Sequence, residues 1–99
     1  MNSDKEVKRH PALIALGNQI RKVRQERGFS QEDFAAEVDL SRSYYGGIER
    51  GERNVAALNL MRIAATLQVE VGQLFPQKMS LENACIPQKN HGRKVTDVG

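Results

Sequence analysis

Apolar residues recur at steps of three and four along the middle of this chain, and this spacing constrains its fold more than any other feature. Such a stripe is typical of an amphipathic helix. One stripe predicts a helix beginning at Pro11, and its members are Leu13, Leu16, Ile20 and Val23. Another predicts a helix over 56–68, and its members are Leu60, Ile63, Ala64 and Leu67. No segment alternates apolar and polar residues as a half-buried strand does, so the sequence predicts an all-α fold.

Capping residues divide the middle of the chain into further helices. Ser30 and Ser41 each precede a short helix-forming stretch, and serine is among the preferred N-cap residues. Gly28 and Gly51 stand where the preceding helices should end, because glycine adopts the left-handed conformation of a helix C-terminus without strain. Residues 70–75, "EVGQLF", are interpreted as a last short helix before a proline. The chain is therefore expected to form a compact five-helix domain.

A change of composition at each end sets the limits of this domain. The chain has 99 residues, enough for one small domain, which we place at 11–75. Residues 1–10 and 76–99 are polar, so we expect a flexible N-terminal arm and a disordered C-terminal tail. The net charge of +3 comes from these two ends, because 11–75 is neutral. Net charge is therefore weak evidence for a nucleic-acid partner, and the arrangement of charge within the domain matters more.

Several classes of protein are excluded by features that the sequence lacks. No apolar run approaches the roughly 20 residues of a membrane span, and the first residues do not resemble a signal peptide. The single cysteine, Cys85, has no internal disulfide partner, so we expect a cytoplasmic protein without a membrane partner. His10 and His91 lack neighbours at metal-ligand spacing, so no metal or other cofactor is expected. The sequence also lacks the motifs of an activated nucleophile or a phosphate-binding loop, which argues against an enzyme.

The two serine-capped helices carry the main indication of function. Ser30 and Ser41 are eleven residues apart, which leaves two short helices joined by a turn of a few residues. Two such helices on a tight turn form a helix-turn-helix motif. The second helix of this motif can enter the major groove of DNA, which is about 12 Å wide.

The same stretch resembles a known family. The sequence "SQEDFAAEVDLSRSYYGGIERGERN", with "GNQIRKVRQERGFSQEDFA" before it and "LNLMRIAATLQVEVGQLF" after it, is similar to the Cro/C1-type, or XRE-like, repressors. The resemblance covers about residues 12–75 and is strongest to the small controller proteins of restriction–modification systems. It implies a lambda-repressor-like domain of five helices and a DNA-binding transcriptional regulator.

The start of the second motif helix holds the candidate base-reading residues. With Ser41 as the cap, Arg42, Ser43 and Tyr44 form the first turn, while Tyr45 faces the core. An arginine here can bond guanine O6 and N7 bidentately, and Ser43 can bond a base edge or a phosphate. Tyr44 can contact a thymine methyl group or a phosphate. We therefore expect the turn, Ser41 included, to lie at the DNA.

Two glycines and three polar residues complete the candidate DNA-binding set. Gly46 and Gly47 lie inside the same helix, although each costs about 1 kcal/mol relative to alanine. We interpret them as keeping one side of the helix thin, so that its backbone can approach the bases or phosphates closely. Arg50, Arg53 and Asn54 follow the helix, and we expect them along the DNA backbone or at a groove edge.

Two further roles are implied by the resemblance. Gln31 is similar to the family glutamine that bonds a DNA phosphate at the start of the first motif helix. Arg24 and Glu49 are similar to an ion pair between the first and third helices of the family. That pair fixes the recognition helix rather than reading DNA.

Five apolar residues of the last two helices exceed the needs of one small core. They are Leu58, Met61, Val71, Leu74 and Phe75, and we expect them at a homodimer interface. Two-fold dimers read two half-sites, so the expected partner is a pseudo-palindromic double-stranded DNA operator. Near a promoter the dimer would block RNA polymerase or contact it as an activator, and both modes stay open. The alternative is an antitoxin-type module that also binds a second protein, for instance through 76–99.

Overall fold

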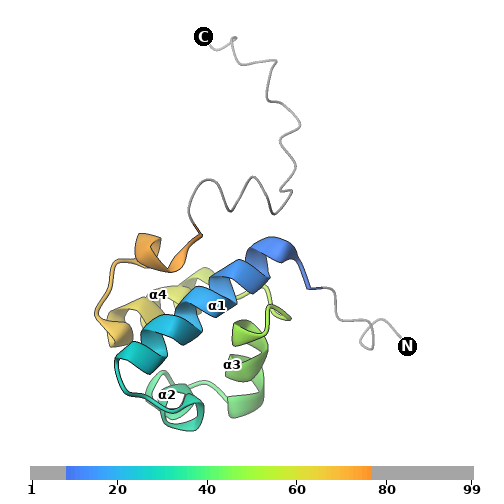
Figure 1. Ribbon diagram of the computed structural model, residues 1–99. Helices are drawn as coiled ribbons and strands as arrows, with labels where there is room; N and C mark the ends of the chain where they lie inside the picture. Colours follow the sequence, from blue (N-terminus) through green and yellow to red (C-terminus); the bar gives the residue numbers. More distant parts are fainter. Residues whose placement is uncertain (1–8, 77–99) are drawn as a thin grey trace, which may run out of the picture.

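The structure is a computed structural model that describes residues 9–76, and it is all-α as the sequence predicted. The arm was expected over 1–10 and the tail over 76–99, and all of both but residues 9, 10 and 76 lies outside the described residues. In Figure 1, α1 crosses in front of α4, with α2 and α3 below it. The elements are α1 Pro11–Glu26, α2 Gln31–Glu37, α3 Arg42–Glu49, α4 Ala57–Leu67 and η2 Val71–Leu74. Between residues 9 and 76, no helix is long and apolar enough to cross a membrane.

The fifth predicted helix differs from expectation, because η2 is a 3-10 helix rather than an α-helix. It holds only four residues and ends at Leu74, two residues before Pro76, which leaves no room for α-helical hydrogen bonds to propagate. The Gln73 side chain accepts a hydrogen bond of 2.8 Å from the backbone N–H of Glu70, which closes this short turn from the side.

Side-chain caps start three of the helices. The hydroxyl of Ser30 accepts from the backbone N–H of Asp33, and that of Ser41 accepts from Tyr44, both at 3.0 Å. Both predicted serine caps are therefore confirmed. The cap of α1 was not foreseen: Nδ1 of His10 accepts from the N–H of Ala12 at 3.0 Å.

All four α-helices end in the same way. Beyond each last turn lies a residue with positive φ: Gly28 at 84°, Gly51 at 79°, Asp39 at 61° and Gln68 at 63°. Each such residue and its successor donate back to the last turn, as in a Schellman motif; after α1 the two bonds are 3.0 and 3.2 Å long. The two predicted glycine ends are confirmed, and Asp39 gives the turn of the helix-turn-helix its sharp reversal.

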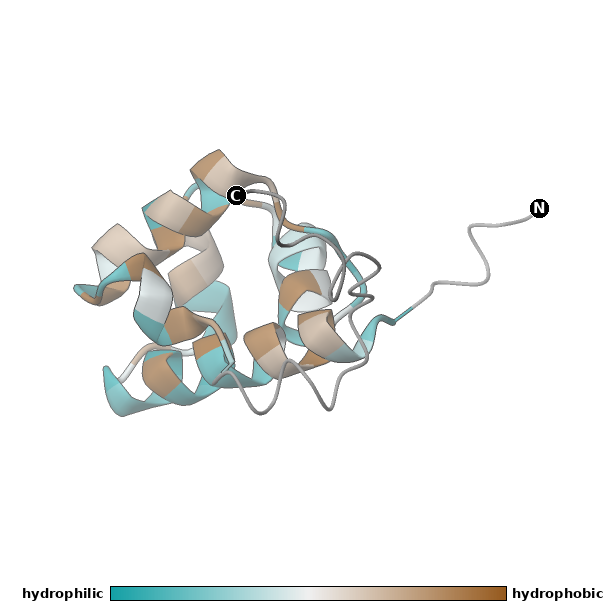
Figure 2. Cartoon of the chain, turned by 90° about the horizontal axis from the view of Figure 1, so that it is seen from above, coloured by the Kyte–Doolittle hydropathy of each residue, from teal (hydrophilic) through white to brown (hydrophobic). Residues whose placement is uncertain are grey.

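The core lies where the helices meet, with the rings of Phe34 and Tyr45 packed 5.3 Å apart at its centre. Brown and teal segments alternate along the helices in Figure 2, as amphipathic helices require. Leu74 is fully buried, because η2 packs against α1 and α4. The expectation that Leu74 lies at a dimer interface is therefore wrong: its side chain completes the core of one chain.

Two helices approach each other closely where Gly17 of α1 meets the end of α3. A Cβ atom on Gly17 would lie 2.4 Å from the carbonyl oxygens of both Ile48 and Glu49. These oxygens belong to backbone, so they cannot rotate away as a flexible side chain could. Gly17 therefore lets the third helix dock directly on the first.

We expect Gly17→Ala to destabilise the domain by at least about 2 kcal/mol, because the added methyl group forces α1 and α3 apart. Gly72→Ala is the matched control, since a Cβ on Gly72 meets nothing within 4 Å. The control should change stability by no more than about 0.5 kcal/mol. Urea unfolding of both variants measures the difference, and equal midpoints for the two would contradict the close approach.

Candidate nucleic-acid interface

The first turn of α3 presents polar side chains to solvent from a helix whose other side is buried. Arg42 and Ser43 are exposed, whereas Tyr45 and Ile48 are in the core. The nearest acid to Arg42 is Glu32 of α2, with 3.9 Å between Nη1 and Oε1, and both side chains are more than 60% exposed. Such a loose surface pair contributes little free energy. The Arg42 guanidinium is therefore available to a ligand.

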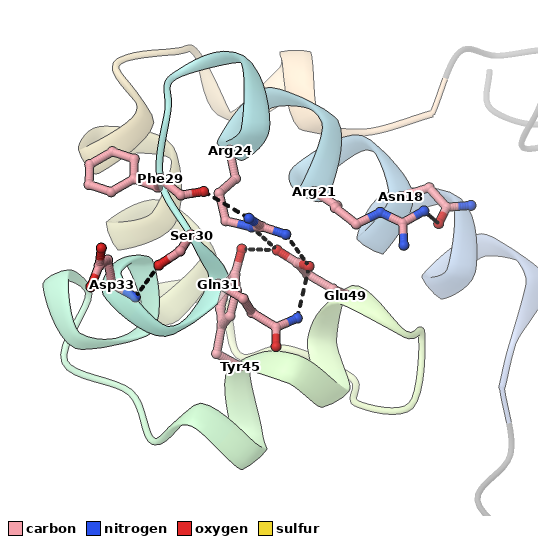
Figure 3. Close-up of polar contacts among 9 residues, drawn as sticks. All are labelled: Asn18, Arg21, Arg24, Phe29, Ser30, Gln31, Asp33, Tyr45 and Glu49. Atoms are coloured by element: carbon pink, nitrogen blue, oxygen red, sulfur yellow. Dashed lines mark hydrogen bonds and ion pairs between the residues drawn. The ribbon is translucent and has the colours of Figure 1, made fainter.

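A buried polar network holds α3 in place from behind (Figure 3). Nε and Nη2 of Arg24 donate to the two carboxylate oxygens of Glu49 at 2.7 and 3.1 Å. Arg24 also donates from Nη1 to the carbonyl oxygen of Phe29 at 2.8 Å. The hydroxyl of Tyr45 donates to Glu49 as well, and Nε2 of Gln31 donates to it at 3.1 Å. The network thus joins α1, α2 and α3 through one carboxylate.

The electrostatics of this network keep Glu49 ionised. Burial by itself raises the pKa of Glu49, but the hydrogen bonds from Arg24, Tyr45 and Gln31 together outweigh it and hold that pKa below its usual value. The hydrogen bond to Glu49 raises the pKa of Arg24 despite burial. Burial, and then the bond to Glu49, raises the pKa of the Tyr45 phenol, so its proton stays in place. At neutral pH Arg24 and Glu49 are therefore both charged, and the Tyr45 hydroxyl keeps its proton and donates a hydrogen bond to Glu49.

Gln31 belongs to this network as well as to the surface. Its side chain is half-buried, and Nε2 faces the Glu49 carboxylate. A phosphate contact, which the resemblance implied, has to use the second N–H of Nε2 or the backbone at the start of α2. That contact stays a prediction.

The two glycines of α3 are buried, which differs from the expectation that their backbone approaches DNA directly. If Gly46 carried a Cβ atom, that atom would lie 3.0 Å from Nη1 of Arg50. A Cβ atom on Gly47 would lie 2.9 Å from Cγ of Arg53. The guanidinium of Arg53 is 5.5 Å from the centre of the Tyr44 ring, in cation–π contact. The chain reverses after α3, so the two arginines lie back over the thin side of the helix. The glycines make room for arginines.

One acidic residue beside the interface escaped sequence reasoning. Glu52 bonds Arg50 through both carboxylate oxygens, at 3.0 and 3.1 Å, and accepts a third bond of 3.2 Å from Arg9. The hydrogen bond from Arg50 lowers the pKa of Glu52. The one sequence feature that indicates Glu52 as a partner for an arginine is its position between Arg50 and Arg53. Asn54 is exposed and lines a shallow hollow with His10 at the start of α1.

The residues expected at a dimer interface divide into two groups. Leu58, Met61 and Phe75 have exposed fractions of 71%, 53% and 43%, and they are the large hydrophobic residues that the described part of the chain leaves exposed. Val71 is half-buried against the core. With Leu74 in the core, the apolar surface is confined to α4 and the neighbourhood of η2.

Comparison with known proteins agrees with this geometry. Residues 20–74 match the family model HTH_3, described as helix-turn-helix. The fold, with α3 capped by Ser41 and its first turn exposed, defines a helix-turn-helix DNA-binding domain. The chain belongs to this family, the XRE-like transcriptional regulators, which are not enzymes.

The relatives within the family include controller proteins. Control protein C.MunI from a Mycoplasma species is 48% identical over 63 residues, which cover 63% of this chain and 85% of that protein. The crystal structure of the restriction–modification controller protein C.AhdI from Aeromonas hydrophila matches with a TM-score of 0.62 and 43% identity, over 64% of this chain and 96% of that one. SinR of Bacillus subtilis, whose crystal structure is in complex with DNA, matches with a TM-score of 0.57 and 32% identity, over 60% of this chain and 95% of that one.

We expect Glu49→Gln to cost about 3–5 kcal/mol, because the buried Arg24 charge loses its counter-ion. In the parent the stabilisation from ionised Glu49 is complete above its ordinary pKa of 4.5 and is lost as pH falls through its lower folded pKa. Urea unfolding between pH 7 and pH 3 should therefore show a decline that is weaker in the variant. Glu37→Gln, an exposed change of the same kind, should leave stability and pH profile near those of the parent. A Glu49→Gln protein as stable as this control would contradict the role of the pair.

Proposed function

We propose that the chain regulates transcription by binding a pseudo-palindromic operator as a homodimer, with each α3 in the major groove of one half-site. One observation carries this proposal: Arg42 and Ser43 stand exposed at the start of a helix that the Arg24–Glu49 pair fixes from behind. The major groove, about 12 Å wide, admits such a helix. Arg42 reads guanine through O6 and N7, and Ser43 bonds a neighbouring base edge or phosphate.

The other candidates position the helix on the duplex. Arg53, lying over Gly47 and against Tyr44, carries its charge beside the first turn of α3, where a phosphate passes. Gln31 at the start of α2 contacts a second phosphate, aided by the helix N-terminus. Contacts of this kind set register and affinity, while the base contacts of Arg42 set sequence.

The homodimer is supported by the apolar surface of α4 and η2. Leu58, Met61 and Phe75 are large and exposed, and α4 packs against η2, which Phe75 directly follows. Burying such side chains against a second copy is favourable, at roughly 25 cal/mol per Å² of apolar area removed from water. A two-fold contact through this surface presents two α3 helices to the same duplex.

Selection of bound sequences from random duplexes, at several salt concentrations, tests the proposal. A symmetric enriched motif and a steep fall of affinity with salt are expected, because several phosphates are contacted. The similarity to C.MunI and C.AhdI supports regulation of a restriction–modification system, so the motif should occur upstream of a neighbouring restriction endonuclease gene. Binding without an enriched motif would overturn the proposed sequence-specific function.

We expect Arg42→Ala to lower affinity for the selected duplex by about 10- to 100-fold, the range of a lost bidentate base contact. Affinity for a scrambled duplex should fall much less, because phosphate contacts remain. Lys22→Ala removes an exposed charge on α1 and is the control. Fluorescence anisotropy titrations provide the measurement. An equal loss on both duplexes would mean that Arg42 contacts phosphate rather than a base.

Met61→Glu is expected to dissociate the homodimer, since it places a charge within the proposed apolar contact. Analytical ultracentrifugation over a dilution series should show the parent as a dimer at micromolar concentration and this variant as a monomer. Gln25→Glu adds the same charge on exposed α1 and should stay dimeric. A parent that remains monomeric throughout the series would refute the homodimer.

A further inference from the structure

The carboxylate of Glu52 holds the Arg50 guanidinium by one defined edge. Nε of Arg50 donates to one carboxylate oxygen at 3.0 Å, and Nη2 donates to the other at 3.1 Å. Arg9 braces the same carboxylate at 3.2 Å from the start of α1. Both Arg50 and Arg9 are about half exposed, so this cluster lies at the surface rather than in the core.

We propose that Glu52 is a positioning residue that sets which edge of Arg50 meets DNA, and thereby contributes to operator specificity. This inference rests on the proposed function. A guanidinium has five N–H donors in a rigid fork. With the Nε–Nη2 edge bonded to Glu52, the edge formed by Nη1 and the second N–H of Nη2 remains for a ligand. Two parallel donors on that edge suit the O6 and N7 acceptors of guanine.

Gly46 leaves space for one end of the free edge along α3. Arg42, Gly46 and Arg50 are spaced four apart, so they form one row along α3. Nη1 of Arg50 occupies the place beside Gly46, 3.0 Å from where a Cβ would stand. Arg50 therefore fills the middle of the row that Arg42 begins. The glycine supplies the space and the carboxylate supplies the orientation.

Glu52 also changes the balance between the two kinds of DNA affinity. A carboxylate at the interface repels phosphates and offsets the charge of an arginine, which weakens sequence-independent attraction. Glu52 is ionised at neutral pH, and the hydrogen bonds from Arg50 and Arg9 lower its pKa still further. The same bonds restrict Arg50 before binding, so less rotamer freedom is lost in the complex. Non-specific binding becomes weaker and discrimination becomes stronger.

Two substitutions separate positioning from charge alone. Glu52→Gln removes the charge and the bidentate acceptor. Glu52→Asp keeps the charge but shortens the side chain by one methylene, so it cannot meet both donors from the same backbone position. Affinities of full-length chains for the selected duplex and for a scrambled duplex are measured by anisotropy. Glu37→Gln, an exposed change of equal charge on α2, is the control.

The specificity ratio, the affinity for the selected duplex over that for the scrambled one, should fall about tenfold in both Glu52 variants. Affinity for the scrambled duplex should rise in Glu52→Gln and stay unchanged in Glu52→Asp and in the control. In an Arg50→Ala background, Glu52→Gln should no longer change the ratio, because the residue that it positions is gone.

Other outcomes overturn the inference. If Glu52→Asp keeps the parent ratio, and Glu52→Gln raises both affinities by the same factor, then Glu52 is only a surface charge. If Glu52→Gln changes the ratio equally in the Arg50→Ala background, it acts through another group. A parent chain that selects no motif would defeat the proposed function itself. A parent that selects a motif, with ratios unchanged in both Glu52 variants, would defeat only this inference.

Discussion

The buried ion pair between Arg24 and Glu49 is the interaction on which the arrangement of this domain depends. Removing two charges from water is costly, and a buried pair is stable only when further hydrogen bonds satisfy both partners. Here the Phe29 carbonyl completes Arg24, while Tyr45 and Gln31 complete Glu49. Because these groups come from three helices and the loop between two of them, the orientation of α3 is fixed by directed bonds as well as by packing.

The surroundings of the pair explain why a short helix can serve as a recognition element. An isolated helix of eight residues is unstable in water, and two interior glycines weaken it further. Three supports compensate: the Ser41 cap at its start, the buried Tyr45 side chain, and the contact of its last carbonyls with Gly17. Its inner side is held throughout its length, and its first turn is left exposed to carry residues that contact DNA.

The sequence predicted those features that depend on local chemistry. The serine caps, the glycine ends and the apolar stripes each involve residues within a turn or two, so their spacing in the chain reports their structure directly. The Arg24–Glu49 pair came from family resemblance and not from any pattern of charge. Leu74 was misplaced because a four-residue helix has too few residues to show which side is buried. Its burial depends on α1 and α4, which are distant in the sequence.

Long-range side-chain geometry also decided the role of the glycines. The sequence showed that α3 is thin at Gly46 and Gly47, but not that Arg50 and Arg53 turn back to cover them, because that depends on the path of the chain after α3. In the proposed complex Arg42 and Arg50 differ in how much side-chain conformational entropy they lose on binding DNA. Arg42 is loosely paired and must lose rotamer freedom on the DNA, whereas Arg50 has lost much of it already to Glu52. A domain with neutral net charge can therefore discriminate among sequences, because the positions and the rigidity of a few guanidinium groups matter more than the sum of charges.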